Sequence, residues 1–273
     1  MTIAVIWRED GLQWCAADTR LVAGHDDEPT TEIAAKIYAI PVVVRALDTE
    51  LKPRQPHYWT QYGFVYAGAM LPATMTALTA STLLQQLARP GDRADPPTFE
   101  QIAEFVCRLA KRFMADRLQF GSDGIFSAAF FGWCPHAMKY KIAHIDGRND
   151  AGSFRVEMFY PPPPQTDGDP WLVLGSGAPT FASTLAEYQK TEKHITKRIP
   201  RRVIDKMVAE GADRTVGGAT SIGAAHQYGF ELFYAAEPIT PGQPAARRVF
   251  NGLDLDTEIG QIGQYIVAAS GLA

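Results

Sequence analysis

Two patterns of apolar residues alternate along the chain and predict different elements. Short runs rich in β-branched and aromatic residues predict strands, and apolar residues spaced three or four apart predict helices. The first two strands are expected at residues 3–7 and 12–17, because Asp10-Gly11 between them is a frequent hairpin turn. An antiparallel pair of this kind returns Asp18 to the beginning of the chain.

The segments that follow predict a loop, a strand and a long connection. Residues 22–31 are polar and predict an exposed loop, whereas residues 33–44 form an apolar run that contains Lys36. Residues 48–59 carry charges and prolines and predict a connection before a strand at residues 62–69.

Helical spacing then takes over, and the two patterns alternate once more. A helix is expected to begin near Pro72 and to end before Pro90, and Thr98-Phe99-Glu100-Gln101 has the form of a capping box that begins a second helix. The same reasoning predicts strands over 124–158 and at 171–174, helices over 180–193 and 200–211, and a final strand within 221–234.

This order of elements predicts an α+β fold in which two antiparallel sheets stack between two layers of helices, a four-layer αββα sandwich. Residues 1–250 are expected to form this single domain. Residues 251–273 are expected to be a C-terminal extension, and the spacing of Ile and Val within 259–267 suggests a short amphipathic helix there, at a subunit contact.

Composition narrows the class of protein. The chain has 273 residues, is 46% hydrophobic and carries a net charge of −4 with both signs mixed, which gives no support for a nucleic-acid partner. No apolar run approaches the length of a membrane span, and Arg8-Glu9-Asp10 interrupts the N-terminal segment too early for a secretory signal. Three cysteines without a CxxC pair suggest reduced thiols, so we expect a cytoplasmic protein.

The second residue has the chemistry of a complete nucleophile–base pair. Removal of Met1 would leave Thr2 with a hydroxyl and a free α-amine on the same residue. An α-amine titrates at roughly 7.7–8.0 in model compounds, so it can act as a base at neutral pH without a histidine. A threonine at this position is common, and its meaning depends on the residues that follow.

Thr2, Asp18 and Lys36 together resemble the beginning of the proteasome β-type family, which includes the bacterial HslV peptidase and the proteasome-like Anbu. The spacing from Thr2 to Asp18 matches that of the family, and the spacing from Asp18 to Lys36 is two residues longer. The resemblance extends from Met1 to about Tyr234 and implies an N-terminal-nucleophile hydrolase with the αββα fold.

The position of the family's lysine has two candidates. Lys36 lies in Ala35-Lys36-Ile37-Tyr38-Ala39-Ile40, which resembles the family's Lys-Ile-φ-x-Ile pattern, and we prefer it. Lys52 is a rival because its distance along the chain from Gly68 is close to the family's own. Without the resemblance, Lys36 would read as a solvated lysine on an edge strand; beside Thr2, its charge would keep the amine neutral and favour the ionised hydroxyl.

Three further positions follow from the resemblance. Gly68 would donate its backbone N–H to the oxyanion, and Ser176 in Gly175-Ser176-Gly177 would hydrogen-bond the Thr2 amine. The segment 211–218 resembles the family's Arg-Asp-x-x-Ser-Gly-Gly and places Asp213 on its Asp. The serine of that pattern is Val216 here, so either Thr215 substitutes for its hydroxyl, or the site tolerates the loss, or activity is weak.

Other chemistry has less support. The six histidines lack the HxxxH and HExxH spacings of metal sites, and there is no GxSxG nucleophile elbow. The Gly-Ser-Gly turn lacks the lysine and the spacing of a P-loop. Cys15 would need a leader of fourteen residues removed before it could be an N-terminal nucleophile, so we expect it in the core. No metal or organic cofactor is implied.

The function predicted from these residues is a threonine peptidase that cleaves peptides or unfolded proteins. The resemblance implies a homo-oligomer, either a ring or a stack, with an unfolding ATPase as a further partner. Two alternatives stay open. The first is a catalytically inactive proteasome-like scaffold or binding protein, which Val216 and the insertion after Lys36 favour. The second is an amidase for small substrates.

Overall fold

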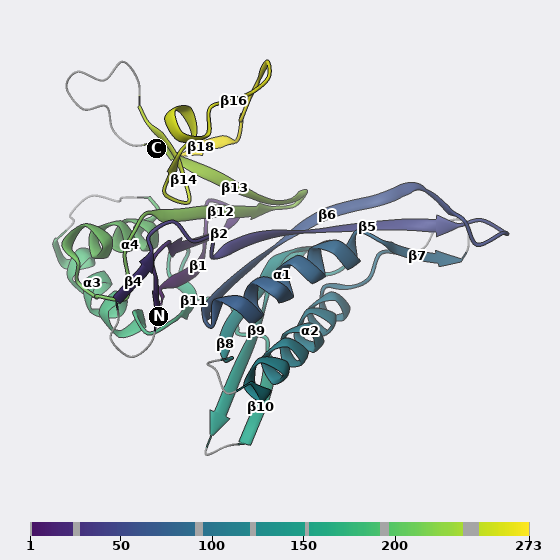
Figure 1. The fold of residues 1–273 in the computed structure, drawn as a ribbon, viewed down its shortest axis with the longest axis horizontal. Helices are drawn as coiled ribbons and strands as arrows, with labels where there is room; N and C mark the ends of the chain where they lie inside the picture. The colour runs from purple at the N-terminus through teal and green to yellow at the C-terminus, as the bar shows by residue number, and fades with distance from the viewer. Residues whose placement is uncertain are drawn as a thin grey trace. The chain divides into compact units, whose positions relative to one another are not determined.

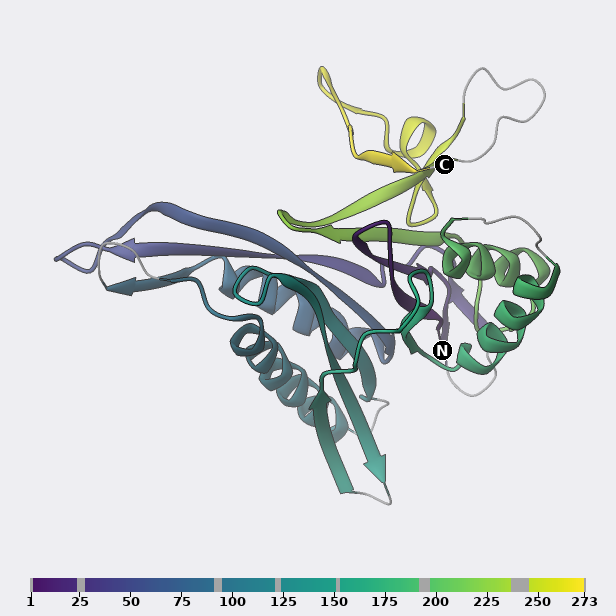
Figure 2. The same cartoon turned by 180° about the vertical axis from the view of Figure 1, so that it is seen from behind.

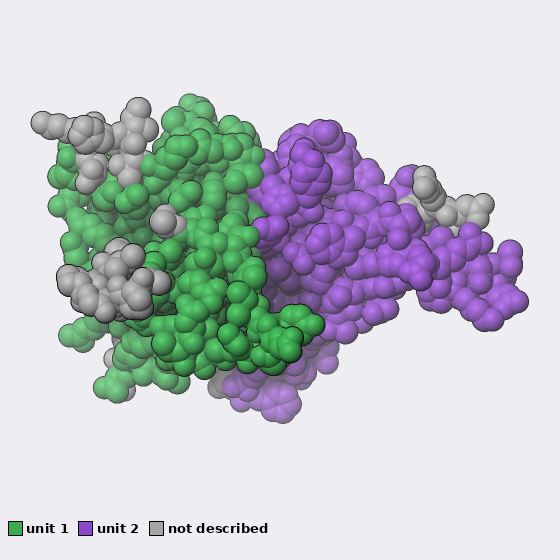
Figure 3. All heavy atoms as spheres, turned by 90° about the horizontal axis from the view of Figure 1, so that it is seen from above, with its two compact units in different colours: residues 1–37, 163–224, 232–273 green, residues 38–162, 225–231 purple. Residues whose placement is uncertain are grey.

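The computed structural model describes residues 2–23, 28–90, 95–120, 124–150, 153–191, 197–236 and 246–272. The fold is of the mixed α+β type and divides into two compact units (Figure 3). Unit 1 comprises residues 1–37, 163–224 and 232–273, and unit 2 comprises residues 38–162 and 225–231. The expectation of one domain over residues 1–250 stays a prediction.

Unit 1 is built around a sheet that contains the N-terminal hairpin (Figure 1). The strand order is β11-β1-β2-β12-β13-β14-β15, and β18 pairs with β13. The predicted hairpin is confirmed: Ala4 pairs with Ala17 and Glu9 with Leu12, and Asp10 and Gly11 turn with φ of 53° and 74°. The bounds are β1 Ala4–Glu9, β2 Leu12–Asp18, β11 Pro170–Leu174, β12 Thr220–His226, β13 Gly229–Ala236, β14 Arg248–Phe250, β15 Leu253–Asp254 and β18 Ser270–Leu272.

Two helices, α3 (Ala178–Thr191) and α4 (Ile199–Glu210), cover one face of the β1–β2 part of this sheet (Figures 1 and 2). Alternate residues of β1 point into the core beneath them, because successive side chains of a strand face opposite sides. This core contains Ile3, Val5, Trp7, Phe181, Val203, Ile204 and Met207. Helix α4 ends at Gly211, which takes the left-handed conformation with φ of 60°, as its sequence predicted.

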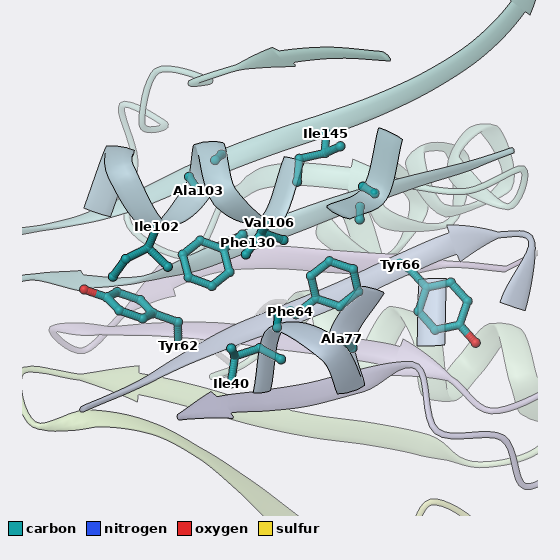
Figure 4. Close-up of a cluster of buried hydrophobic side chains, with 14 of the residues drawn as sticks. Ile40, Tyr62, Phe64, Tyr66, Ala77, Ile102, Ala103, Val106, Phe130 and Ile145 are labelled. Carbon is teal, nitrogen blue, oxygen red and sulfur yellow. The ribbon is translucent and has the colours of Figure 1, made fainter. Parts of the chain in front are cut away.

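Unit 2 has a second sheet, in the order β10-β9-β8-β6-β5-β7, with α1 (Met70–Leu84) and α2 (Phe99–Gln119) on one face. The predicted capping box at the start of α2 is confirmed, because Thr98 and Gln101 bond each other's backbone N–H groups. Apolar side chains from both helices and from the strands interlock beneath them (Figure 4). The bounds are β5 Ile37–Leu47, β6 Pro53–Gly68, β7 Leu87–Pro90, β8 Phe126–Cys134, β9 Lys139–Asp150 and β10 Ser153–Phe159.

Several sequence predictions of loops were wrong. Residues 53–59 belong to β6, and Pro53 and Pro56 are tolerated there because this end of the strand is exposed. Within 22–31, the described residues form part of the short pair β3 (Leu21–Ala23) and β4 (Glu28–Thr31). The expected single strand within 221–234 is the hairpin of β12 and β13.

The predicted C-terminal helix over 259–267 is not observed. Asp254 caps a π-helical turn, η1 (Leu255–Ile259), and a two-stranded hairpin of β16 (Gln261–Ile262) and β17 (Tyr265–Ile266) follows. Gly260 and Gly263 both have positive φ, which ends the helix and turns the hairpin. Among the described residues, no helix has the length and the apolar character needed to cross a membrane.

Candidate active site

Thr2 lies at the start of β1, where its residue is 1% exposed. Its carbonyl oxygen accepts a hydrogen bond of 3.3 Å from the N–H of Gly177, the second glycine of the Gly-Ser-Gly turn. The structure therefore brings the beginning of the chain against a segment 175 residues later. The expected hydrogen bond from Ser176 to the Thr2 amine stays a prediction.

Asp18, at the end of β2, makes three hydrogen bonds in a fully buried position. Its Oδ1 accepts from the Lys36 ammonium at 2.7 Å and from the Ile3 N–H at 3.0 Å. Its Oδ2 accepts from the Gly217 N–H at 3.1 Å. One oxygen thus joins Lys36 to the peptide that links Thr2 to Ile3. The hairpin explains this contact, because its register sets Asp18 beside the first residues of β1.

Burial dominates the electrostatics of this ion pair, since both side chains are 0% exposed. Burial raises the pKa of Asp18, and the charge and hydrogen bond of Lys36 and the two backbone N–H donors oppose that rise. Burial lowers the pKa of Lys36, and Asp18 opposes that fall. The three donors together stabilise the ionised carboxylate, which in turn holds the ammonium in place.

The rival lysine has a different environment. The Lys52 side chain is 72% exposed and forms a salt bridge with Glu50. Lys36, by contrast, has no exposed surface and contacts Asp18 directly, so it is not a solvated edge lysine. The geometry therefore favours Lys36 for the lysine position of the site.

Ser176 and Asp213 are connected through Thr215. Asp213 Oδ1 accepts from the Thr215 N–H at 2.8 Å and from the Thr215 hydroxyl at 2.6 Å. That hydroxyl lies 3.4 Å from Ser176 Oγ, and Thr215 is 4% exposed. Thr215 therefore joins the polar network beside Val216, which has no hydroxyl to offer.

Val216 is part of the core and leaves no room beside Gly177. Val216 is fully buried, and a Cβ added at Gly177 would lie 2.8 Å from Val216 Cγ2 and 3.2 Å from Ile3 Cβ. The glycine thus allows the turn to approach the Thr2 carbonyl closely.

We expect Gly177→Ala to destabilise the protein by about 1–3 kcal/mol, because the new methyl group overpacks a rigid site. Urea unfolding followed by tryptophan fluorescence would measure the loss. Gly177 does not have a positive φ, so the loss reports the Cβ contact and not backbone strain. Unchanged stability of Gly177→Ala would contradict the close contact.

Gly68 ends β6 in unit 2, whereas the other candidate residues are in unit 1. It has a φ of +109°, and an added Cβ would lie 2.8 Å from the carbonyl oxygen of Ile125. Both features require glycine for backbone reasons. Its predicted role as oxyanion donor stays a prediction, and Met1 lies outside the described residues.

Two contributors were missed from sequence. Gly217 supplies the second N–H donor to Asp18, and Arg20 donates to the backbone of the same loop. The Gly-Gly pair after Val216 was noted only as part of a family pattern, although it could have indicated a close backbone approach. Nothing in the sequence around Arg20 distinguishes it from a solvated arginine.

Comparison with known proteins bears on the fold of the chain and not on the residues of the site. No family model matches the chain, and no curated protein matches its sequence. Among solved structures, the chain is similar to a Gly-1 mutant of Anbu from Hyphomicrobium sp. strain MC1, with 16% identity and a TM-score of 0.51. The match covers 85% of this chain and 84% of the other. The predicted resemblance to the proteasome-like proteins is confirmed for the fold.

Proposed function

We propose that this protein is a threonine hydrolase of the N-terminal-nucleophile type that cleaves peptide bonds. One observation carries the proposal: the buried Asp18–Lys36 ion pair shares Asp18 Oδ1 with the N–H that follows Thr2. A core that needed only stability would do as well or better with apolar residues at both positions. Through Asp18 the Lys36 ammonium is linked to the Thr2–Ile3 peptide, and a cation near the Thr2 hydroxyl would favour its ionised form.

In the proposed mechanism, Met1 is removed and Thr2 becomes the first residue. The Thr2 hydroxyl attacks the substrate carbonyl, and its proton passes to the α-amine, through a water molecule. Lys36 favours the ionised hydroxyl, while Asp18, Ser176 and Asp213 orient the groups around it. The Gly68 N–H stabilises the oxyanion. The amine then protonates the leaving group, and water hydrolyses the ester formed on Thr2.

The proposed arrangement of layers is the four-layer αββα sandwich. Its support is that parts of two strands, β1 and β6, have buried residues on both faces. In β1, Ala4 and Ile6 are buried on the face opposite Val5. In β6, Val65 is buried on the face opposite Phe64.

The proposed substrates are peptides or unfolded proteins, in a cytoplasmic homo-oligomer that forms a ring or stack, with an ATPase as a further partner. The chemistry alone allows a second function, an amidase for small substrates. Rates of hydrolysis of fluorogenic peptides and of small acyl-amides separate the two. Faster turnover of peptides supports the peptidase, and turnover of acyl-amides alone would replace it with the amidase.

The inactive scaffold is favoured by a specific observation, the absence of a hydroxyl at the fully buried Val216. Thr215 compensates in part for the missing hydroxyl, because its own hydroxyl bonds Asp213 and lies near Ser176. Hydrolysis of neither substrate class by the purified oligomer would favour the scaffold.

A further inference from the structure

The Arg20 guanidinium lies against the back of the loop that supplies the second N–H donor to Asp18. Its Nη1 donates to the carbonyl oxygen of Arg214 at 2.9 Å and to that of Val216 at 3.3 Å. A Cβ added at Gly217 would overlap the guanidinium group. Arg20 therefore bonds the carbonyl of the same peptide whose N–H bonds Asp18, and the carbonyl of Arg214 before it.

Glu32 fixes the guanidinium in this position. Its two carboxylate oxygens each accept from Arg20 Nε at 3.0 Å, and Oε1 also lies 3.0 Å from Nη2. Glu32 occupies the edge of the guanidinium formed by Nε and Nη2. The remaining nitrogen, Nη1, donates to the loop.

The backbone around Arg20 is tied to the same loop. The N–H groups of Thr19 and Arg20 donate to the Gly217 carbonyl at 3.2 and 3.0 Å. The Thr19 hydroxyl donates to the Glu32 carbonyl and accepts from the Ala219 N–H at 2.7 Å. Gly218 has a φ of +76°, and a Cβ there would overlap Thr19 and Glu32. Asp18, Arg20, Glu32 and the loop thus form one connected unit.

We propose that the Arg20–Glu32 ion pair is a positioning device that holds the Gly217 N–H on Asp18. The pair bonds the loop that holds Asp18, so it acts on the site through Asp18. Its importance for hydrolysis rests on the proposed function, whereas its effect on the loop does not.

The first experiment is independent of activity. Hydrogen exchange of the full-length oligomer, followed by mass spectrometry of peptides that cover residues 213–219, reports on this loop. Arg20→Met should speed exchange there by about tenfold or more, because the loop loses hydrogen bonds from a charged donor. Arg20→Lys should do nearly the same, since lysine keeps the charge but lacks the fork. Arg214→Met is the control, because it also replaces an arginine by methionine but keeps the backbone carbonyl that Arg20 bonds.

The second experiment uses the hydrolysis rate. We expect Arg20→Met and Arg20→Lys to lower kcat by about ten- to hundredfold with little change in KM. The acid limb of the pH profile should also move to higher pH, because the Gly217 N–H lowers the pKa of Asp18 and its loss lets that pKa rise. The charged groups that shift the pKa of Asp18 or of Lys36 are these two residues themselves, Arg20 and Glu32. Glu32→Gln should move the limb in the same direction.

The outcomes separate the two claims. Unchanged exchange in both Arg20 variants overturns the positioning device, whatever the activity. Wild-type behaviour of Arg20→Lys, with only Arg20→Met affected, overturns it as well, because charge alone would then explain the effect. A wild-type protein that hydrolyses nothing contradicts the proposed function, while faster exchange in both variants would still support the device.

Discussion

Replacing Thr2 by alanine should abolish hydrolysis of every amide substrate that the wild-type protein cleaves, with a loss of at least about 10⁴-fold in kcat. Alanine keeps the backbone and the α-amine and removes the hydroxyl together with one methyl group. Because the Thr2 carbonyl, not its side chain, bonds Gly177, the turn that holds the start of the chain should remain. Initial rates with fluorogenic peptides measure the change, and circular dichroism checks that the fold is kept.

Two further variants decide what such a loss means. Thr2→Ser keeps a hydroxyl on the same residue and should retain measurable activity. Thr191→Ala removes an exposed hydroxyl at the end of α3, which bonds carbonyls of its own helix, and should leave the rate unchanged. Residual activity of Thr2→Ala close to that of the wild type would place the nucleophile elsewhere.

The second large effect concerns stability. Asp18→Asn should destabilise the protein by about 3–5 kcal/mol, because it leaves the Lys36 ammonium buried without its counter-charge. The loss should shrink as pH rises. The pKa of Lys36 is already lowered by burial, and without Asp18 it falls further; a group with a lowered folded-state pKa loses stability as pH falls through that value and regains it above. Urea titrations between neutral pH and about pH 10 test this trend.

The double variant Asp18→Asn with Lys36→Met is the control for this mechanism. It removes the buried charge as well as its partner, and methionine has a similar length, so much of the lost stability should return. If the double variant were no more stable than Asp18→Asn alone, the cost would come from the hydrogen bonds to Ile3 and Gly217 instead.

Features of the fold that depend on neighbouring residues could be predicted from the sequence, and features that depend on distant partners could not. The N-terminal hairpin, the capping box at Thr98 and the helix end at Gly211 were predicted because turns and caps depend on a few neighbouring residues. The pairing of β7 with β5 was missed, since a short strand of four residues after a helix carries no local period. The C-terminal hairpin was mistaken for a helix because the apolar spacing was counted across two glycines.

The same distinction applies to the site. Asp18 and Lys36 were identified through a resemblance, and the hairpin gave a physical reason why Asp18 should approach the start of the chain. The role of Arg20 could not be read from sequence, because its partners on the loop are backbone carbonyls almost 200 residues away. Every residue has a backbone carbonyl, so the residue type does not indicate which carbonyls Arg20 will bond.

The proposed hydrolysis depends most directly on Thr2 becoming the first residue, because only a free amine there can take the proton of the hydroxyl. The intact mass of the purified protein, measured under denaturing conditions, tests this in one spectrum. We predict the mass of a chain that has lost one methionine and nothing else. A mass that includes Met1 would mean that the amine is in a peptide bond, and it would contradict the hydrolase.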